Sequence, residues 1–390
     1  MKRWIAVFLV VGVLPVAVLP GCDQSPSGST DQSSDEEPAE TTDCISSGTG
    51  SAVQSVLNDG QDAVLCQGAE FNIQQRLNYA VGGQSIYTEG RPTGEDRAVL
   101  KIDTSELATI VKETEQSNVT LQSVIVDGAR PEFGYVDEEA LLIFGRNVQG
   151  ATIEDVRAKN TRSWSTLHLP RWGRDCRGIT VRDNTFGPAG TADGRWADGI
   201  SLACQDSEVV GNRIVDATDG GIVIFGAAGS TVKDNRIVAE SRTLLGGINM
   251  VDYGNDGIHS DYSGTTVVEN IIDADGALIK IALGIGPSVW NWCHRSGDRN
   301  RGGTVKDNVL EGSEMGYGFV VDGVENWTAT GNVDNSSHVG AAGTGCGGNE
   351  MPEPKGFLIN RDRSEGTFQE SFQDPGVPLH GGLELQLDGN

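Results

Sequence analysis

A repeated phrase built around asparagine constrains the fold more than any other feature of the chain. The phrase is a branched apolar residue, two further residues, the asparagine and a second apolar pair. Its asparagines are Asn184, Asn212, Asn235, Asn270, Asn308 and, in a weaker copy, Asn332, at spacings of 28, 23, 35, 38 and 24 residues. Spacings with a minimum in the low twenties predict a unit of about 22 residues that carries loops of different lengths. We therefore predict an all-β fold, a single-stranded right-handed parallel β-helix, with the asparagine amides hydrogen-bonded in a stack at one corner.

Short apolar segments punctuated by glycine supply the strands of such coils. Ser51–Leu57 has instead the apolar periodicity of a short helix, which would cover the open N-terminal end of the solenoid. A single domain suffices because a solenoid grows by adding coils. The clearest predicted strands are Leu141–Phe144, Thr166–Leu169, Gly199–Ala203, Gly221–Phe225, Gly247–Val251, Ala277–Leu283 and Gly318–Val321.

The N-terminal segment has the features of an export signal. Lys2 and Arg3 precede an apolar run that is shorter than most membrane spans, and we interpret residues 1–21 as a signal peptide. The ending Leu-Pro-Gly-Cys22 resembles a bacterial lipoprotein cleavage site, which implies a lipid on Cys22; an ordinary signal peptide with a chance cysteine is the alternative. Residues 22–43 are polar and predict a disordered tether, and residues 44–390 form the β-helix domain. We expect an exported protein at the bacterial cell envelope or cell surface, which contacts the membrane only through this lipid.

The six cysteines that follow Cys22 are an even number, which in an exported chain favours disulfides. No Cys-x-x-Cys pair occurs in the sequence, so we expect no zinc site. Among the possible pairings we predict Cys44–Cys66, Cys176–Cys204 and Cys293–Cys346.

The chain is strongly acidic, with a net charge of −26. This charge argues against nucleic acid as a partner and predicts a soluble domain, which we expect to be a monomer. Basic residues nevertheless concentrate between Arg157 and Arg195 and again between His294 and Lys306. Such concentrations on an acidic body predict a specific anion site.

Tryptophans accompany these basic residues in segments that lengthen the repeat. The insertions span residues 187–196, 252–263 and 285–303, and loops from the same corner of successive coils would build a common wall. Aromatic rings stack on sugars and arginines bind carboxylate or sulfate, so we predict a carbohydrate groove. The candidate substrate-binding residues are Trp164, Arg171, Trp172, Arg174, Arg195, Trp196, Trp290, Trp292, Arg295 and Arg299.

Two Asp-Gly pairs stand one coil apart. Asp198 and Asp219 are separated by 21 residues, so we expect their carboxyl groups at equivalent points of neighbouring coils, about 4.8 Å apart. Close carboxyl groups couple, and the pKa of one of them rises. A protonated carboxylic acid beside an ionised carboxylate is the pair that glycoside hydrolysis requires. The alternative is that each Asp-Gly pair only makes a turn, as Asp275-Gly276 does.

Residues 196–282 resemble the polygalacturonase-type pectin hydrolases, which are β-helix proteins of the pectin-lyase type. The matching motifs are Trp-Ala-Asp198-Gly, Thr-Asp219-Gly and Leu-Ile-Lys280, although Gly220 replaces an aspartate and glycines replace the histidine of that family. The resemblance implies Asp219 as general acid, Asp198 as the group that assists the attacking water, and Lys280 as a uronate contact. Asp252, Asp256 and His259 could replace the missing groups.

Two other kinds of function stay open at this stage. A polysaccharide lyase or a uronan C5-epimerase could use Lys280, Arg295 and Arg299 with a calcium ion held by Asp252, Asp256 and Asp261. A non-catalytic solenoid that binds glycans at the surface would need none of this chemistry. We predict a hydrolase of acidic, uronate-containing polysaccharide that requires no cofactor or metal.

Overall fold

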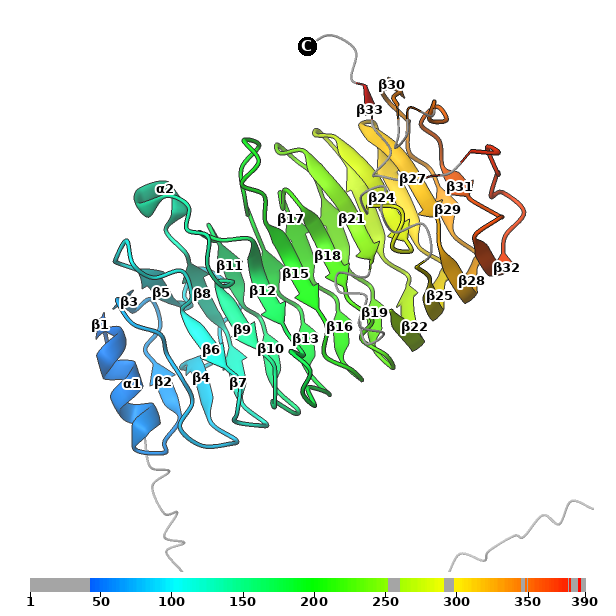
Figure 1. The fold of residues 1–390 in the computed structure, drawn as a ribbon. Coiled ribbons are helices and arrows are strands. Elements are labelled where there is room, and N and C mark those ends of the chain that lie inside the picture. Colours follow the sequence, from blue (N-terminus) through cyan, green and yellow to red (C-terminus); the bar gives the residue numbers. More distant parts are fainter. Residues whose placement is uncertain are drawn as a thin grey trace, which may run out of the picture. The chain divides into compact units, whose positions relative to one another are not determined.

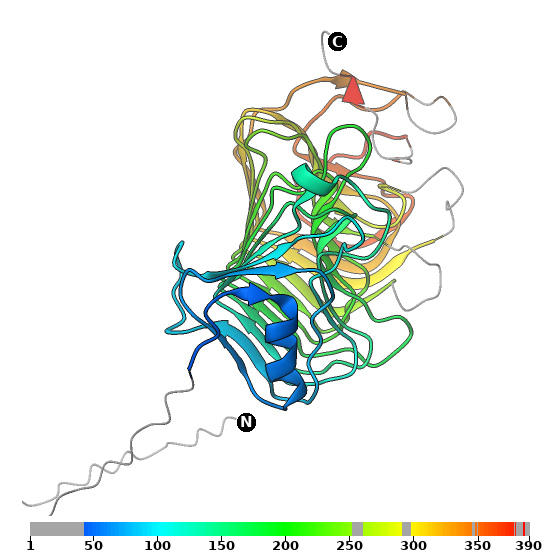
Figure 2. The same cartoon turned by 90° about the vertical axis from the view of Figure 1, so that its left-hand side faces the viewer.

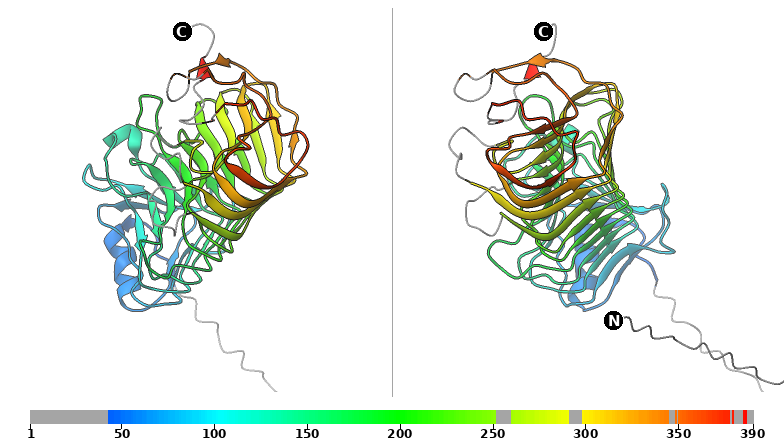
Figure 3. Two further views of the ribbon diagram at one scale, coloured as in Figure 1. Left: turned by 45° about the vertical axis from the view of Figure 1, so that its right-hand side comes forward. Right: turned by 90° about the vertical axis from the view of Figure 1, so that its right-hand side faces the viewer.

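The computed structural model describes residues 43–251, 260–290, 298–344, 348, 350–377, 379 and 385–386. In this part of the chain, three parallel sheets wind into a right-handed β-helix, as predicted from the asparagine repeat (Figure 1). The same segment of each coil pairs with the next coil, so residues far apart in sequence lie side by side (Figures 2 and 3).

Sheets A and B have eleven strands each among the described residues. Sheet A consists of β2 (Ala63–Leu65), β4 (Ser85–Thr88), β7 (Thr120–Gln122), β10 (Thr152–Glu154), β13 (Thr180–Arg182), β16 (Glu208–Val210), β19 (Thr231–Lys233), β22 (Asp261–Val268), β25 (Asn300–Lys306), β28 (Val324–Thr330) and β32 (Ser364–Phe368). Sheet B consists of β1 (Gly48–Thr49), β3 (Glu70–Ile73), β5 (Ala98–Ile102), β8 (Val124–Asp127), β11 (Arg157–Lys159), β14 (Thr185–Phe186), β17 (Arg213–Val215), β20 (Arg236–Val238), β23 (Ile271–Ala274), β26 (Val309–Gly312) and β29 (Val333–Asp334).

Sheet C carries the residues of most functional interest. Its strands are β6 (Val111–Glu113), β9 (Leu142–Phe144), β12 (Ser165–Leu169), β15 (Asp198–Leu202), β18 (Gly220–Ile224), β21 (Leu244–Met250), β24 (Ile279–Ile285), β27 (Met315–Val321) and β31 (Phe357–Ile359). A separate antiparallel pair joins β30 (Ala341–Ala342) to β33 (Leu385–Gln386).

Helix content is small, as expected. The predicted capping helix is α1 (Gly50–Asn58), whose buried Val53 and Leu57 belong to the hydrophobic core at its N-terminal end. A single turn of helix, α2 (Arg130–Phe133), follows β8. No helix of the described segments is long and apolar enough to cross a membrane.

The predicted asparagine ladder is present and fully buried. The side-chain amide of each asparagine donates to the side-chain oxygen of the next, at 2.8 Å from Asn184 to Asn212 and 3.0 Å from Asn308 to Asn332. The residue before each ladder asparagine has a left-handed backbone, a conformation that glycine, asparagine and aspartate adopt at least cost. These residues are Asp183, Gly211, Asp234, Glu269, Asp307 and Gly331.

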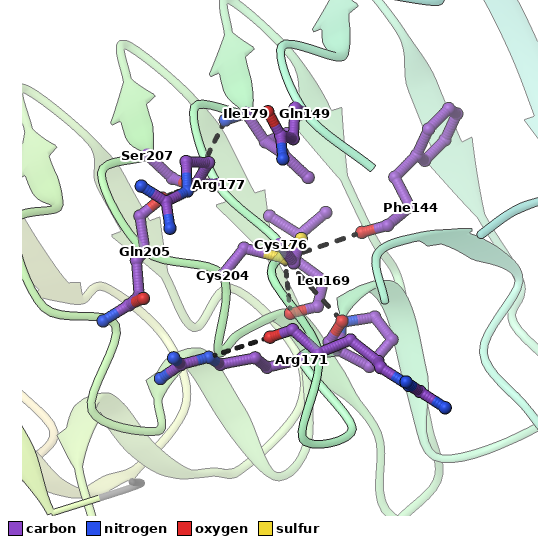
Figure 4. The surroundings of a disulfide bond; sticks show 12 residues. Phe144, Gln149, Leu169, Arg171, Cys176, Arg177, Ile179, Cys204, Gln205 and Ser207 are labelled. Carbon is purple, nitrogen blue, oxygen red and sulfur yellow. Dashed lines mark hydrogen bonds between the residues drawn. A yellow bond between two sulfur atoms is a disulfide. The ribbon is translucent and has the colours of Figure 1, made fainter. Parts of the chain in front are cut away.

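Two of the predicted disulfides join neighbouring coils. They are Cys44–Cys66 and Cys176–Cys204, and the second lies near Leu169 and Arg171 (Figure 4). Cys293 and Cys346 lie outside the described residues, so their pairing stays a prediction. Disulfides of this kind are typical of oxidising, extracytoplasmic compartments.

A histidine near the C-terminal end of the solenoid is held in its charged form. The ring nitrogens of His338 lie 2.6 Å from the carbonyl oxygen of Gly316 and 2.8 Å from Oδ2 of Asp334. Because both partners are acceptors, both nitrogens must carry hydrogen. Burial opposes the imidazolium, but these two hydrogen bonds outweigh it and raise the pKa of His338.

We therefore expect His338→Gln to destabilise the protein by about 1 kcal/mol more at mildly acidic than at alkaline pH. The contribution of a raised histidine pKa is complete below about pH 6.5 and is lost as the pH rises through the folded-state pKa. Urea denaturation of both proteins at about pH 5.5 and about pH 9 measures the difference. An equal loss at both pH values would show that the ring is not charged.

Candidate active site

The outer face of sheet C carries the candidate site. One column of sheet C residues faces the core, and the next residue of each strand faces outward because side chains alternate along a strand. The core column is Leu167, Ile200, Ile222, Ile248 and Leu283. The outward column is His168, Ser201, Val223, Asn249 and Gly284.

Asp198 and Asp219 both lie at the start of sheet C strands, but not at equivalent points. The register places Gly220, not Asp219, beside Asp198, and the Gly220 N–H donates to Oδ1 of Asp198 at 2.8 Å. The predicted equivalence is therefore wrong by one residue. The reason is that this coil repeats after 22 residues, as Ile200 and Ile222 show, whereas the two aspartates are 21 residues apart.

The two carboxyl groups nevertheless interact. Asp198 is only 7% exposed, and Asp219 is partly exposed. Burial, followed by repulsion from Asp219, raises the pKa of Asp198 well above its ordinary value, against hydrogen bonds from Ser201 and Gly220. Burial also raises the pKa of Asp219. The two carboxyl groups therefore interact as expected, although Asp219 is not directly beside Asp198 in the sheet.

Two serine hydroxyls lie beside Asp198. Oγ of Ser201 donates to Oδ2 of Asp198 at 2.7 Å and lies 2.9 Å from Oγ of Ser165, which donates to the carbonyl oxygen of Leu167 at 3.1 Å. The Ser201 hydroxyl and the Gly220 N–H therefore both donate to this carboxyl group, and both lower its pKa. Burial, the largest influence, opposes them and favours a protonated Asp198.

Glycines make room for these polar side chains. A Cβ atom on Gly220 would lie 3.0 Å from Oδ1 of Asp198, and one on Gly246 would lie 2.2 Å from the side-chain nitrogen of Asn249. The Cβ on Gly220 would also lie 2.2 Å from Cγ2 of Val223, so a side chain there would displace Val223 and crowd Asp198, and a side chain at Gly246 would displace Asn249.

Aromatic residues continue the site on β12. The ring of His168 lies between Trp164 and Trp172, with centroid distances of 4.8 and 5.9 Å and edge-to-face geometry. Burial lowers the pKa of His168 to about 3, so the ring is neutral at neutral pH. Trp172 is 48% exposed and offers a ring surface to solvent.

The other end of the site lies on β21 and β24. The indole N–H of Trp290 donates to Oδ1 of Asn249 at 2.7 Å, and Nζ of Lys280 lies 5.8 Å from the centre of the Trp290 ring. Beyond Trp290, an apolar cluster that includes Ile281, Tyr317 and Leu358 covers the outer face of sheet C. Polar side chains therefore occupy this face mainly from β12 to β21.

The three insertions do not leave the same corner, so the predicted common wall is wrong. Residues 187–196 lead into β15, whereas the other two insertions follow β21 and β24. The spacing between ladder asparagines measures a whole coil and does not say which corner carries the extra residues. The predicted tryptophans flank sheet C instead, with Trp164 and the 43% exposed Trp196 before its strands and Trp172 and Trp290 after them.

Four of the eight basic residues between Arg157 and Arg195 form ion pairs within the described segments, three of them with acids of other coils, which corrects the prediction of a concentrated positive charge. Ion pairs join Arg157 to Glu95, Lys159 to Asp127, Arg177 to Asp175 and Arg182 to Glu154. The buried Arg162 donates instead to backbone carbonyls, including those of Leu107 and Gly134. Glu95, Asp127 and Glu154 are distant in sequence from their partners and become neighbours only through coil stacking, whereas Asp175 is two residues from Arg177.

The remaining predicted residues divide into two groups. Arg171 and Arg174 lie on the turn after β12, where Nε of Arg171 donates to the carbonyl of Arg174, and Arg299 pairs with Glu365 on β32. Asp252, Asp256, His259, Trp292, Arg295 and Cys22 lie outside the described residues. Among the described residues, no group of acidic, histidine or cysteine side chains is arranged to hold a metal ion.

The residues that the sequence analysis missed are His168, Ser165, Ser201 and Asn249. His168 was accessible to sequence reasoning, because alternation along the predicted strand Thr166–Leu169 places it outward between core leucines. The serines and Asn249 carried no such signal, since their role depends on contacts with Asp198 and Trp290.

No protein-family model and no curated protein matches the sequence. Among solved structures, the fold is similar to the tailspike protein of E. coli bacteriophage HK620, a mutant in complex with a pentasaccharide. That match has a TM-score of 0.54 and 11% identity, and covers 79% of this chain and 55% of the tailspike chain. The fold is also similar to that of an alginate lyase from Paenibacillus sp. str. FPU-7, with a TM-score of 0.44 and 13% identity. This match covers 75% of this chain and 96% of the lyase chain. At these identities the similarity concerns the fold alone.

Proposed function

We propose that the protein binds an acidic polysaccharide along the outer face of sheet C and hydrolyses it with Asp198 and Asp219. The observation that carries this proposal is the coupled pair of carboxyl groups with raised pKa at the starts of β15 and β18. Glycoside hydrolysis uses one carboxyl group as an acid and another as a base or nucleophile. The surrounding rings of Trp164, Trp172 and Trp290 offer stacking surfaces for sugars.

The local contacts favour Asp198 as the acid and Asp219 as the ionised partner, the reverse of the roles that the polygalacturonase resemblance implies. Asp198 holds its proton through burial and through repulsion from Asp219. When the proton leaves, the Ser201 hydroxyl and the Gly220 N–H donate to the new carboxylate. Asp219 is the more exposed of the two and can contact the attacking water.

Two further observations support a carbohydrate ligand. The fold is similar to that of a tailspike protein solved in complex with a pentasaccharide, which supports an oligosaccharide as ligand. The disulfides are typical of an exported protein. Extracellular polysaccharides are accessible to such a protein. We also propose that residues 1–21 are an export signal and that residues 22–43 are a tether anchored by a lipid.

Product analysis on a panel of uronate-containing and neutral polysaccharides tests the proposed reaction. We expect the parent protein to release saturated reducing ends from an acidic polysaccharide. An unsaturated product that absorbs in the near ultraviolet would instead show a lyase, and an altered uronate composition without shortening would show an epimerase. Retention of glycan with no change in length would show a binding protein, and each of these three results would contradict hydrolysis.

A further inference from the structure

A cavity of about 250 Å³ opens at the corner between sheets B and C, outside the carboxyl pair. Its lining comes from three segments distant in sequence: Arg130 and Tyr135 at and after α2, Thr191 to Arg195 before β15, and Arg242 after β20. Only Arg195 in this lining was expected from the sequence to bind substrate. The other two arginines reach the cavity because their turns stack at the same corner.

The cavity is held together by the arginines themselves. Arg130 is buried and donates to Oγ1 of Thr191 at 2.9 Å and to the carbonyl oxygen of Arg195 at 2.8 Å, while Arg242 donates to the carbonyl of Gly190 at 2.6 Å. The guanidinium groups of Arg130 and Arg195 each lie 5.3 Å from the centre of the Tyr135 ring. Tyr135 is thus shared between two cations in a preformed arrangement.

The charge of this lining is not balanced. In the described part of the chain, Arg130, Arg195 and Arg242 form no ion pair with a carboxylate, whereas Arg213 on the neighbouring strand β17 pairs with Glu240. Asp193 is the acidic side chain in the lining, and its carboxylate accepts from the hydroxyl of Thr191 and the N–H of Arg195. Three guanidinium groups therefore face one carboxylate, in a protein whose net charge is −26.

We propose that this cavity binds a carboxylate or sulfate group carried by a glycan. Guanidinium groups present paired N–H donors that match either oxyanion, and a ring beside them can stack on the sugar that carries it. Arg195 lies three residues before Asp198, with the exposed Trp196 between them, so a glycan seated here continues toward the carboxyl pair. The inference rests on the proposed function, for which it names an anion-binding subsite.

Arg195→Gln tests the subsite most directly, because the Arg195 side chain contacts the Tyr135 ring while Arg130 and Arg242 also hold the loop. Binding is measured by calorimetry with an oligogalacturonate, a sulfated galactan oligosaccharide, a neutral xylo-oligosaccharide and inorganic sulfate. The Asp198→Asn background prevents consumption of any probe. Arg213→Gln is the matched control, since it removes the same charge from an exposed ion pair outside the cavity.

We expect Arg195→Gln to weaken binding of the anionic oligosaccharide about tenfold or more, and to leave the neutral probe unchanged. The probe that loses affinity, uronate or sulfated, identifies whether the cavity binds a carboxylate or a sulfate group. Equal affinities in Arg195→Gln and Arg213→Gln, or no binding of any anionic probe to the protein, would overturn the subsite. Because binding is measured without turnover, a protein that binds through Arg195 but cleaves nothing would refute hydrolysis and keep the subsite.

Discussion

Replacement of Asp198 by asparagine is expected to lower the rate of polysaccharide hydrolysis by about 10²- to 10⁴-fold and to leave the stability of the fold nearly unchanged. An asparagine fits the same space, since its oxygen can accept from the Gly220 N–H and its nitrogen can donate to Oγ of Ser201 once that hydroxyl turns to donate to Ser165. It cannot, however, release a proton to a leaving sugar. The release of reducing ends measures the rate, and urea denaturation measures the stability.

Asp275→Asn is the matched control for this change. Asp275 also precedes a glycine at a turn, but it is exposed and lies outside the outer face of sheet C. It should retain the activity of the parent. Full activity of Asp198→Asn would show that Asp198 is not the acid, whereas a large loss of stability would show that its carboxyl group is ionised in the folded protein.

Asn235→Ala is expected to lower the free energy of unfolding by about 3 kcal/mol or more. The side-chain oxygen of Asn235 accepts from the backbone N–H and the amide of Asn212, and its amide donates to Asn270 and to the carbonyl of Val209. The substitution removes all four bonds and leaves buried donors of Asn212 unpaired. Chemical denaturation monitored by circular dichroism measures the loss.

Asn147→Ala provides the comparison, because the amide of Asn147 donates to the exposed carboxylate of Glu115 outside the ladder. Its effect should stay within about 0.5 kcal/mol. If both variants lost the same small amount, the ladder would be a consequence of coil stacking and not a cause of its stability.

The asparagine repeat predicted the fold because it is a local pattern that every coil repeats. Each ladder residue has an apolar strand on either side, which is visible in sequence, and the left-handed residue before it was found in the structure. The predicted disulfides Cys44–Cys66 and Cys176–Cys204 are confirmed, and their sequence separations of 22 and 28 residues suit bridges between neighbouring coils. The candidate site was harder to predict from sequence, since a difference of one residue in coil length placed Gly220 beside Asp198.

Charge was the property that the sequence misrepresented most. Arg157 and Arg182 belong to a basic stretch of sequence, yet their partners Glu95 and Glu154 lie in other coils. Arg130 and Arg242 stand in no such stretch, yet they meet Arg195 in one cavity. Linear clustering of charge therefore did not predict the ion pairs between coils, and it predicted Arg195 alone among the three arginines of the cavity.

The amino-acid sequence by itself determined the solenoid, its asparagine ladder and the strands that carry the two aspartates, because these depend on periodicity along the chain. Only the tertiary structure decided which residues lie beside Asp198, which corner each insertion leaves and which arginines remain without an acidic partner. Those relations join successive coils, and they depend on the length of every loop between them.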